Sequence, residues 1–191
     1  QAFCDKPLII NTCLSGNVLD KARNPHLPVN TEEIVEDAGR AIEAGASMLH
    51  VHARDETGAP SWQPERFARI FEGIRRNYPE VVLVATTSGR QHGALEYRSA
   101  VLHLDGAARP DMASLTLGSL NFPTQPSINA PETIQQLCAI MRDRGILPEL
   151  EVFDPGMLNY GFYLQRKGLL PKDCYVNLIL GSLGTVPGRR P

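Results

Sequence analysis

The sequence is poor in aromatic residues and in cysteine, and neither sign of charge predominates in it. Aromatic residues make up 6% of the chain, and its four cysteines lie scattered. The formal net charge is −2, so the composition offers no basic surface for nucleic acid or for an anionic membrane. No apolar run approaches the ~18 residues that a membrane-spanning helix needs. We therefore expect neither nucleic acid nor a membrane among the partners of this protein.

The cysteines also bear on the cellular compartment. They form no C-x-x-C pair, the spacing typical of redox and zinc sites. Cys13, Cys138 and Cys174 fall in predicted strands and helices, where we expect reduced, mostly buried thiols. This usage predicts a cytoplasmic protein.

The sequence does contain a regular alternation of short apolar runs and helical patterns. Three of the helical patterns stop at a glycine, which tolerates the left-handed turn at a helix C-terminus. Such alternation implies parallel strands with helices packed outside them. Strands are predicted at 7–13, 47–52, 81–86, 111–116, 147–153 and 174–180, and helices at 31–44, 64–78, 95–103, 131–144 and 157–167.

Polar residues on one face of several strands favour a closed barrel over an open, doubly wound sheet. In an open sheet both faces of a central strand meet helices, so such strands are apolar throughout. Here His50 and His52 share one face of their strand, and Glu149 and Glu151 share one face of another. Polar side chains near the C-terminal ends of several strands build the active site of a TIM barrel. The predicted fold class is therefore α/β, a (β/α)₈ TIM barrel.

The predicted strands account for about six of the eight βα units of such a barrel. We therefore interpret residues 1–191 as a single TIM-barrel domain that lacks the C-terminal strands seven and eight. On this interpretation a further segment or a partner chain completes the barrel.

The strongest chemical signal is the triplet from His50 to His52. Two side chains at positions i and i+2 of a strand project to the same face, so both imidazoles can reach one metal ion. Imidazole suits zinc, iron or copper, and zinc is the usual ion of hydrolytic or lyase-type sites. We predict that His50 and His52 are metal ligands and that the cofactor is Zn²⁺, with another divalent metal as the alternative.

Two carboxylates and several hydroxyl groups accompany the histidines. Glu151 lies near the C-terminal end of its strand and is the predicted catalytic carboxylate. A buried Glu149 would need a partner, for which Arg54 is a candidate. Hydroxyl and backbone N–H groups after the third and fourth strands suit a substrate carboxylate. The predicted substrate-binding residues are Thr86, Gly89, Ser114 and Thr116.

At the level of motifs, the chain resembles the β-keto acid cleavage enzymes, typified by 3-keto-5-aminohexanoate cleavage enzyme. The matching segments run in the family's order across nearly the whole chain, which makes the set far more specific than the two histidines alone. They are 24–28 (NPHLP), 43–46 (EAGA), 49–55 (LHVHARD), 112–122 (MASLTLGSLNF) and 148–154 (PELEVFD), with Gly156 and Met157 following.

The resemblance implies a zinc-dependent barrel that condenses a β-keto acid with acetyl-CoA, giving acetoacetate and a new CoA thioester. It implies zinc ligation by His50 and His52, with Thr86, Gly89 and Ser114 where the family holds the keto acid. Glu151 matches a carboxylate implicated in the family's active site. A homo-oligomer is also implied, because the family commonly assembles into multimers.

Two departures from the family's pattern qualify these expectations. The family's third zinc ligand, a glutamate near the last strand, and the residues that the resemblance would make the general base lie beyond the end of this sequence. We therefore expect weak metal binding and no activity if nothing completes the site. The member that acts on an amino-bearing keto acid has a glutamate where this chain has Val18. Because valine cannot pair with an ammonium group, we expect a substrate without a positive charge at that end.

Other interpretations of the histidine pair remain open. Amidohydrolase-type hydrolases place such a pair on the first barrel strand, and acyl-CoA lyases place it late in the barrel, whereas here it ends the second strand. A non-catalytic protein that binds a metal or a carboxylate is the remaining alternative. An all-β cupin is excluded by the helical segments.

Overall fold

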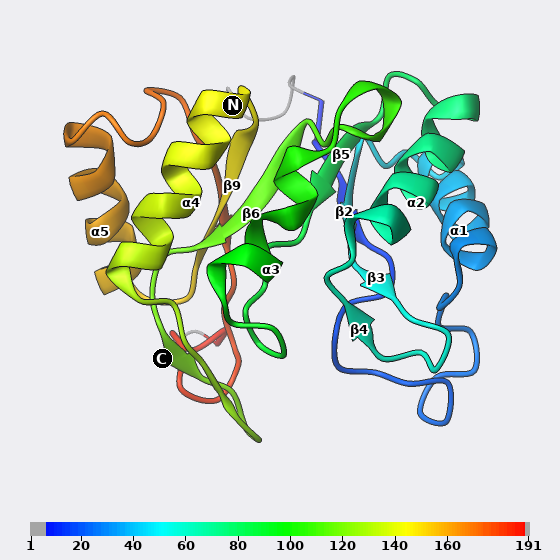
Figure 1. The fold of residues 1–191 in the computed structure, drawn as a ribbon. Coiled ribbons are helices and arrows are strands. Elements are labelled where there is room, and N and C mark those ends of the chain that lie inside the picture. Colours follow the sequence, from blue (N-terminus) through cyan, green and yellow to red (C-terminus); the bar gives the residue numbers. More distant parts are fainter. Residues whose placement is uncertain (1–6, 190–191) are drawn as a thin grey trace.

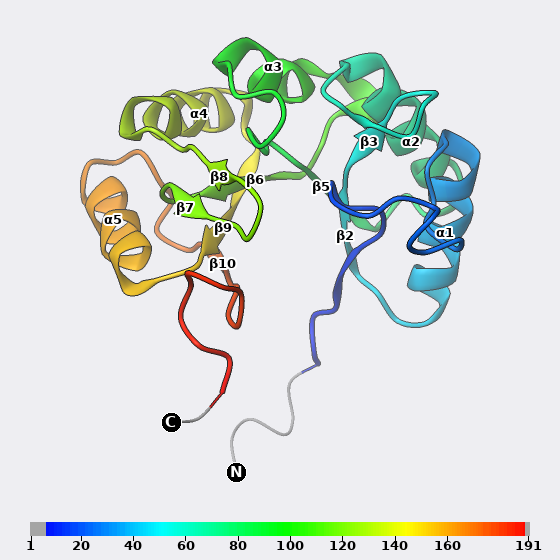
Figure 2. The same cartoon turned by 90° about the horizontal axis from the view of Figure 1, so that it is seen from below.

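The computed structural model describes residues 7–189, and its core is one parallel sheet whose strands stand side by side in chain order. The sheet curls, and the five α-helices form an arc around its outer side (Figure 2). Its strands are β1 (Asn11–Cys13), β2 (Met48–Val51), β5 (Val82–Ala85), β6 (Met112–Thr116), β9 (Leu147–Val152) and β10 (Tyr175–Leu178).

The helices follow the strands in alternation, as the sequence predicted (Figure 1). The connections contain two short antiparallel hairpins, β3 (Ala53–Arg54) with β4 (Pro60–Ser61) and β7 (Leu120–Asn121) with β8 (Pro126–Ser127). They also contain the 3₁₀ turn η2 (Gly106–Ala108). The helices are α1 (Thr31–Glu43), α2 (Pro64–Asn77), α3 (Leu95–Ser99) with its 3₁₀ extension η1 (Ala100–His103), α4 (Pro131–Arg144) and α5 (Pro155–Arg166).

This arrangement confirms the α/β class and gives a curled, half-barrel sheet. Every neighbouring pair of its strands is parallel. Within residues 7–189, β1 and β10 are the two edges of the sheet. The count of six units out of eight, and the single-domain interpretation, stay predictions.

Local sequence signals explain where the helices begin and end. At α1 the Asn30 side chain accepts a hydrogen bond from the Glu33 backbone N–H at 2.8 Å, and the Glu33 side chain bonds back to the Asn30 N–H. At α5 the Asp154 side chain accepts from the Met157 N–H, so this helix begins at Pro155, two residues before its predicted start. Gly145 ends α4 with φ at 63°, the left-handed conformation expected of glycine there.

The two faces of the sheet differ in chemistry. The convex face packs Leu49, Leu83 and Leu115 against the helices, and all three are fully buried. The concave face carries a small apolar layer of Met48, Val84 and Met112. Nearer the carboxyl ends of the strands this face becomes polar, because strand register places Ser114 beside Glu149 and Thr116 beside Glu151.

The structure bears on two expectations, the burial of the cysteines and the lack of a membrane-spanning helix. Cys138 is buried and Cys174 partly buried, but the expectation for Cys13 was wrong, because it lies exposed on the edge strand β1. In the described part of the chain, every helix is too short or too polar to cross a membrane.

Candidate metal and substrate site

His50 is held by a buried carboxylate. Its Nδ1 lies 2.6 Å from Oε2 of Glu149, which projects from β9 and has no exposed surface. The other oxygen of Glu149, Oε1, accepts a hydrogen bond of 2.7 Å from the Asn11 side chain on β1. Both carboxylate oxygens are therefore engaged, which fixes the imidazole ring and leaves its Nε2 as the atom available to a metal.

This contact corrects one expectation of the sequence analysis. Arg54 does not reach Glu149; its guanidinium instead donates to the backbone carbonyls of Ser15, Gly16 and Gly58. Burial alone would lower the pKa of His50, but the hydrogen bond and the negative charge of Glu149 outweigh it, so the pKa is raised.

His52 lies beside His50, with 5.0 Å between the ring centroids. Its Nδ1 is buried and has no hydrogen-bond partner within residues 7–189. Burial holds the pKa of His52 well below its usual value, and the charges of His50, Arg54 and Arg90 add to this effect. A neutral imidazole with an unsatisfied buried nitrogen is the form in which histidine binds a metal.

Glu151 completes the cluster from the same strand as Glu149. Its Oε2 accepts a hydrogen bond of 2.5 Å from the Thr116 hydroxyl on the neighbouring β6. Burial raises the pKa of Glu151, although the charge of His50 and the Thr116 hydrogen bond oppose the shift. Its other oxygen accepts no hydrogen bond from the described residues and can reach a ligand.

The donor atoms of these side chains fit a divalent metal. Ligand atoms of His50, Glu149 and Glu151 lie within 4.8 Å of one another. Imidazole nitrogen and carboxylate oxygen are the donors typical of catalytic zinc, which keeps an open position for substrate. Because both oxygens of Glu149 are already engaged, we assign it to the support of His50 and not to the ligands. This group shares His50 with the predicted pair and does not include His52.

A cavity of about 180 Å³ opens beside this cluster. Of the predicted residues, His52, Thr86, Thr116 and Glu151 line it. Ser88, from the turn after the third predicted strand whose hydroxyls were expected to hold a carboxylate, also lines it. Three further lining residues were not predicted as site residues: Asn17, Arg90 and Phe122.

Ser114 and Gly89 are not among the residues that line the cavity. The Ser114 hydroxyl accepts from the Thr87 N–H, and the Thr87 hydroxyl donates to the Ser114 carbonyl at 2.6 Å, which ties the ends of β5 and β6 together. A Cβ on Gly89 would lie 3.2 Å from the Arg98 Cζ. Glycine at this position thus makes room for Arg98, which is buried and donates to the Thr87 carbonyl and to the Asn129 side chain.

Arg90 brings a positive charge to the cavity. Its guanidinium stacks over the Phe122 ring, with Cζ 3.6 Å from the ring centroid. Burial lowers the pKa of Arg90, and the charge of Glu151 opposes this effect. Since arginine stays protonated in proteins, Arg90 presents a fixed cation to the cavity.

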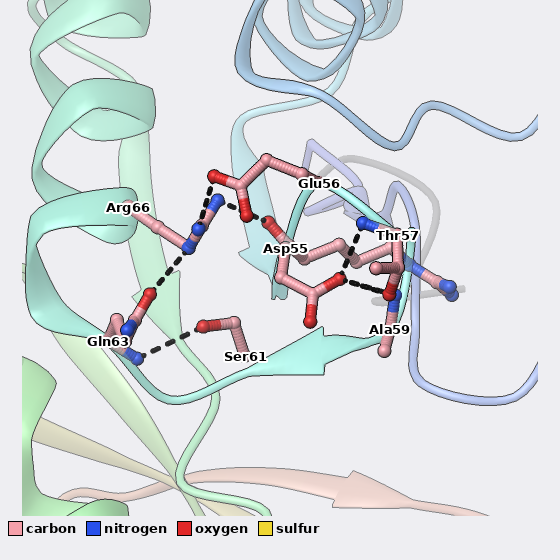
Figure 3. A network of polar contacts seen from close by, with 8 residues as sticks. Asp55, Glu56, Thr57, Ala59, Ser61, Gln63 and Arg66 are labelled. Carbon is pink, nitrogen blue, oxygen red and sulfur yellow. Dashed lines mark hydrogen bonds and ion pairs between the residues drawn. The ribbon is translucent and has the colours of Figure 1, made fainter.

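Arg54 and Asp55, which follow the histidine pair after Ala53, support the hairpin outside the cavity. The Asp55 carboxylate accepts hydrogen bonds from the Thr57 N–H and hydroxyl and from the Ala59 N–H (Figure 3). Arg66 on α2 reaches across to Glu56 and Gln63 in the same network. The pKa of Asp55 is lowered, first by the Thr57 hydroxyl. These contacts hold the loop that follows β2 and thereby the position of His52.

Comparison with known proteins places the chain in one family. The profile of the beta-keto acid cleavage enzyme family matches residues 7–191. The chain is 37% identical to a 3-oxoadipate:acetyl-CoA acetyltransferase of Cupriavidus necator, over 95% of this chain and 62% of that protein. It is 34% identical to a 3-keto-5-aminohexanoate cleavage enzyme of Fusobacterium nucleatum, over 91% of this chain and 63% of that protein.

A solved structure shares the fold of this chain. The chain superposes on the apo structure of ObcA with a TM-score of 0.76 and 26% identity, covering 83% of this chain and 37% of ObcA. The chain spans about three fifths of the length of the two curated relatives, 62% and 63% respectively.

Proposed function

The chain belongs to the beta-keto acid cleavage enzyme family, and from this premise we propose that its protein transfers a two-carbon unit from a β-keto acid to acetyl-CoA. The bond between carbons 2 and 3 of the keto acid breaks, and carbon 2 joins the acetyl carbonyl carbon to give acetoacetate. The CoA sulfur passes to the remaining acyl group, so the second product is a new acyl-CoA.

The observation that carries this proposal is the fixed His50 ring beside the unsatisfied His52 nitrogen, at the edge of a cavity that also contains Glu151. We propose His50 and His52 as ligands of a divalent metal, with Zn²⁺ the ion best suited to them. When bound, the metal would supply a Lewis acid for the β-keto carbonyl.

The side chains of the cavity have distinct roles in this proposal. Thr86 and Thr116 offer hydroxyl groups to the keto acid, and Ser114 and Gly89 shape the wall behind them. Glu151 acts as an acid/base or substrate-orienting carboxylate, because it lines the cavity and one of its oxygens accepts no hydrogen bond from the described residues. The Thr116 hydrogen bond fixes one oxygen of Glu151 and so directs the other.

The test combines metal content with product formation. We expect His50→Ala and His52→Ala variants to lose bound zinc and acetoacetate formation together, because each removes an imidazole from the proposed site. The matched control is His103→Ala, since His103 is exposed at the end of η1. Full zinc binding by both site variants would overturn the assignment. Assembly into a homo-oligomer and cytoplasmic localisation stay predictions.

A further inference from the structure

We infer that Arg90 is a specificity residue that binds a second carboxylate, at the end of the substrate remote from the keto acid group. The preferred substrates would then be β-keto dicarboxylic acids. This inference rests on the proposed function, because it assigns the outer part of the same cavity.

The first observation is the unpaired charge of Arg90. Its guanidinium forms no ion pair with a carboxylate of residues 7–189. The one acidic residue that lines the cavity, Glu151, bonds instead to Thr116. A partly desolvated cation without a partner is costly, so a ligand anion that pairs with it gains binding energy.

The second observation is that the guanidinium is already oriented. Stacking on Phe122 holds its plane, with 3.6 Å between Cζ and the ring centroid. The residues that precede Arg90 are also restrained. A side chain at Gly89 would meet buried Arg98, since an added Cβ would lie 3.2 Å from the Arg98 Cζ, and the Ser88 hydroxyl accepts from the Arg90 N–H. A guanidinium held in place loses little entropy when it binds a carboxylate through two parallel hydrogen bonds.

The third observation is where Arg90 lies within the cavity. His52, Thr116 and Glu151 stand at or next to the carboxyl ends of strands β2, β6 and β9, where the reacting group would bind. Arg90 and Phe122 come from the loops beyond β5 and β7. Because Arg90 lines the same cavity as these residues, a substrate whose carbonyl meets the strand ends can place its other end at Arg90.

The positive charge of Arg90 also bears on the expectation drawn from Val18. Val18 is 62% exposed and is not among the residues that line the cavity, so its own contact with a substrate stays a prediction. Arg90 provides an independent reason against an ammonium-bearing substrate, because like charges in one cavity repel.

The test is a calorimetric titration of the zinc-loaded protein, without acetyl-CoA, with freshly prepared 3-oxoadipate and 3-oxohexanoate. The two ligands share a six-carbon chain and differ in whether it ends in a carboxylate or a methyl group. We expect about 10- to 100-fold tighter binding of 3-oxoadipate, the range of a charge-assisted pair. In Arg90→Met, which keeps a long side chain against Phe122, this preference should fall to about 3-fold or less. Arg90→Lys, which keeps the charge without the planar fork, should retain part of it.

Arg142→Met is the matched control, because the Arg142 side chain is 54% exposed on α4, away from this cavity. It should leave the preference of the wild-type protein intact. Equal weakening of both ligands in Arg90→Met would overturn the inference, since Arg90 would then hold the carboxylate common to both. No effect on either ligand, or no preference in the wild type, would overturn it as well.

A parallel assay of acetoacetate formation separates this inference from the proposed function. Selective binding of 3-oxoadipate that depends on Arg90, without any acetoacetate when acetyl-CoA is added, would support the inference and refute the proposed reaction. Acetoacetate formed at equal rates from both acids, with Arg90→Met unaffected, would support the reaction and refute the inference.

Discussion

The replacement of Glu149 by glutamine tests how the structure positions His50. Glu149 accepts from both of its neighbours, the His50 ring and the Asn11 side chain, at 2.6 and 2.7 Å. An amide has the same shape but one acceptor oxygen, so in Glu149→Gln one of the two donors faces an NH₂ group. The charge that favours a Nδ1-protonated ring, with Nε2 free for a metal, is lost as well.

The expected result follows from measured effects of such outer partners of metal ligands. Their loss lowers metal affinity about 10- to 100-fold, or about 1.4 to 2.8 kcal/mol. Asn11→Ala should produce a smaller loss, because it removes one hydrogen bond to Glu149 and leaves the carboxylate in place. Zinc affinity is measured by competition with a chromophoric chelator, and the free energy of unfolding of the metal-free variants by urea titration.

Glu36→Gln is the matched control, because the Glu36 side chain is 72% exposed on α1 and, among residues 7–189, pairs only with Arg40. Zinc affinity of Glu149→Gln equal to that of the control would refute the role assigned to Glu149. Complete loss of zinc binding in a variant that still folds would contradict it in the other direction, since Glu149 would then be a ligand itself.

Four further predictions concern stability and thiol chemistry. Gly89→Ala should lower the free energy of unfolding by about 1–3 kcal/mol in a urea titration, because the new Cβ crowds the buried Arg98 side chain. Asn30→Ala should cost about 1 kcal/mol in the same assay by removing the cap of α1, whereas Asn30→Asp should cost little. Burial raises the pKa of Cys138 to about 12, so the native protein should protect this thiol from alkylation at pH 8, as peptide mapping would show. Because the folded pKa lies above the usual value of 9.0, this group should also make wild-type stability fall from about pH 9 to about pH 12 relative to Cys138→Ala; identical pH profiles would contradict this.

The strands and helices could be predicted from the sequence because each has its own hydrophobic periodicity. Phe67, Ile70, Phe71 and Ile74 recur at helical spacing, and all four are buried in α2 as expected. The hairpins β3–β4 and β7–β8 were missed because their two-residue strands are too short to show any period.

Only part of the site could be predicted from the sequence, because contacts between distant strands and loops leave no periodic pattern. The pair His50 and His52 follows from the alternation of side chains within one strand. The partner of Glu149 does not, because it depends on how β9 lies relative to β2, and two other strands, β5 and β6, separate them in the curled sheet. Arg90 belongs to a loop without periodicity, so its place in the cavity, over the Phe122 ring, follows only from the structure.

The central claim is the transfer of a two-carbon unit to acetyl-CoA, and isotope tracing tests it most directly. The zinc-loaded protein is incubated with unlabelled 3-oxoadipate and with acetyl-CoA carrying ¹³C in both acetyl carbons, and the acetoacetate is examined by NMR. The account predicts label in the methyl and keto carbons of acetoacetate, none in its other two carbons, and an unlabelled new acyl-CoA. Failure to form acetoacetate, or acetoacetate without label from acetyl-CoA, would contradict the account and return the hydrolase, lyase and non-catalytic interpretations to consideration.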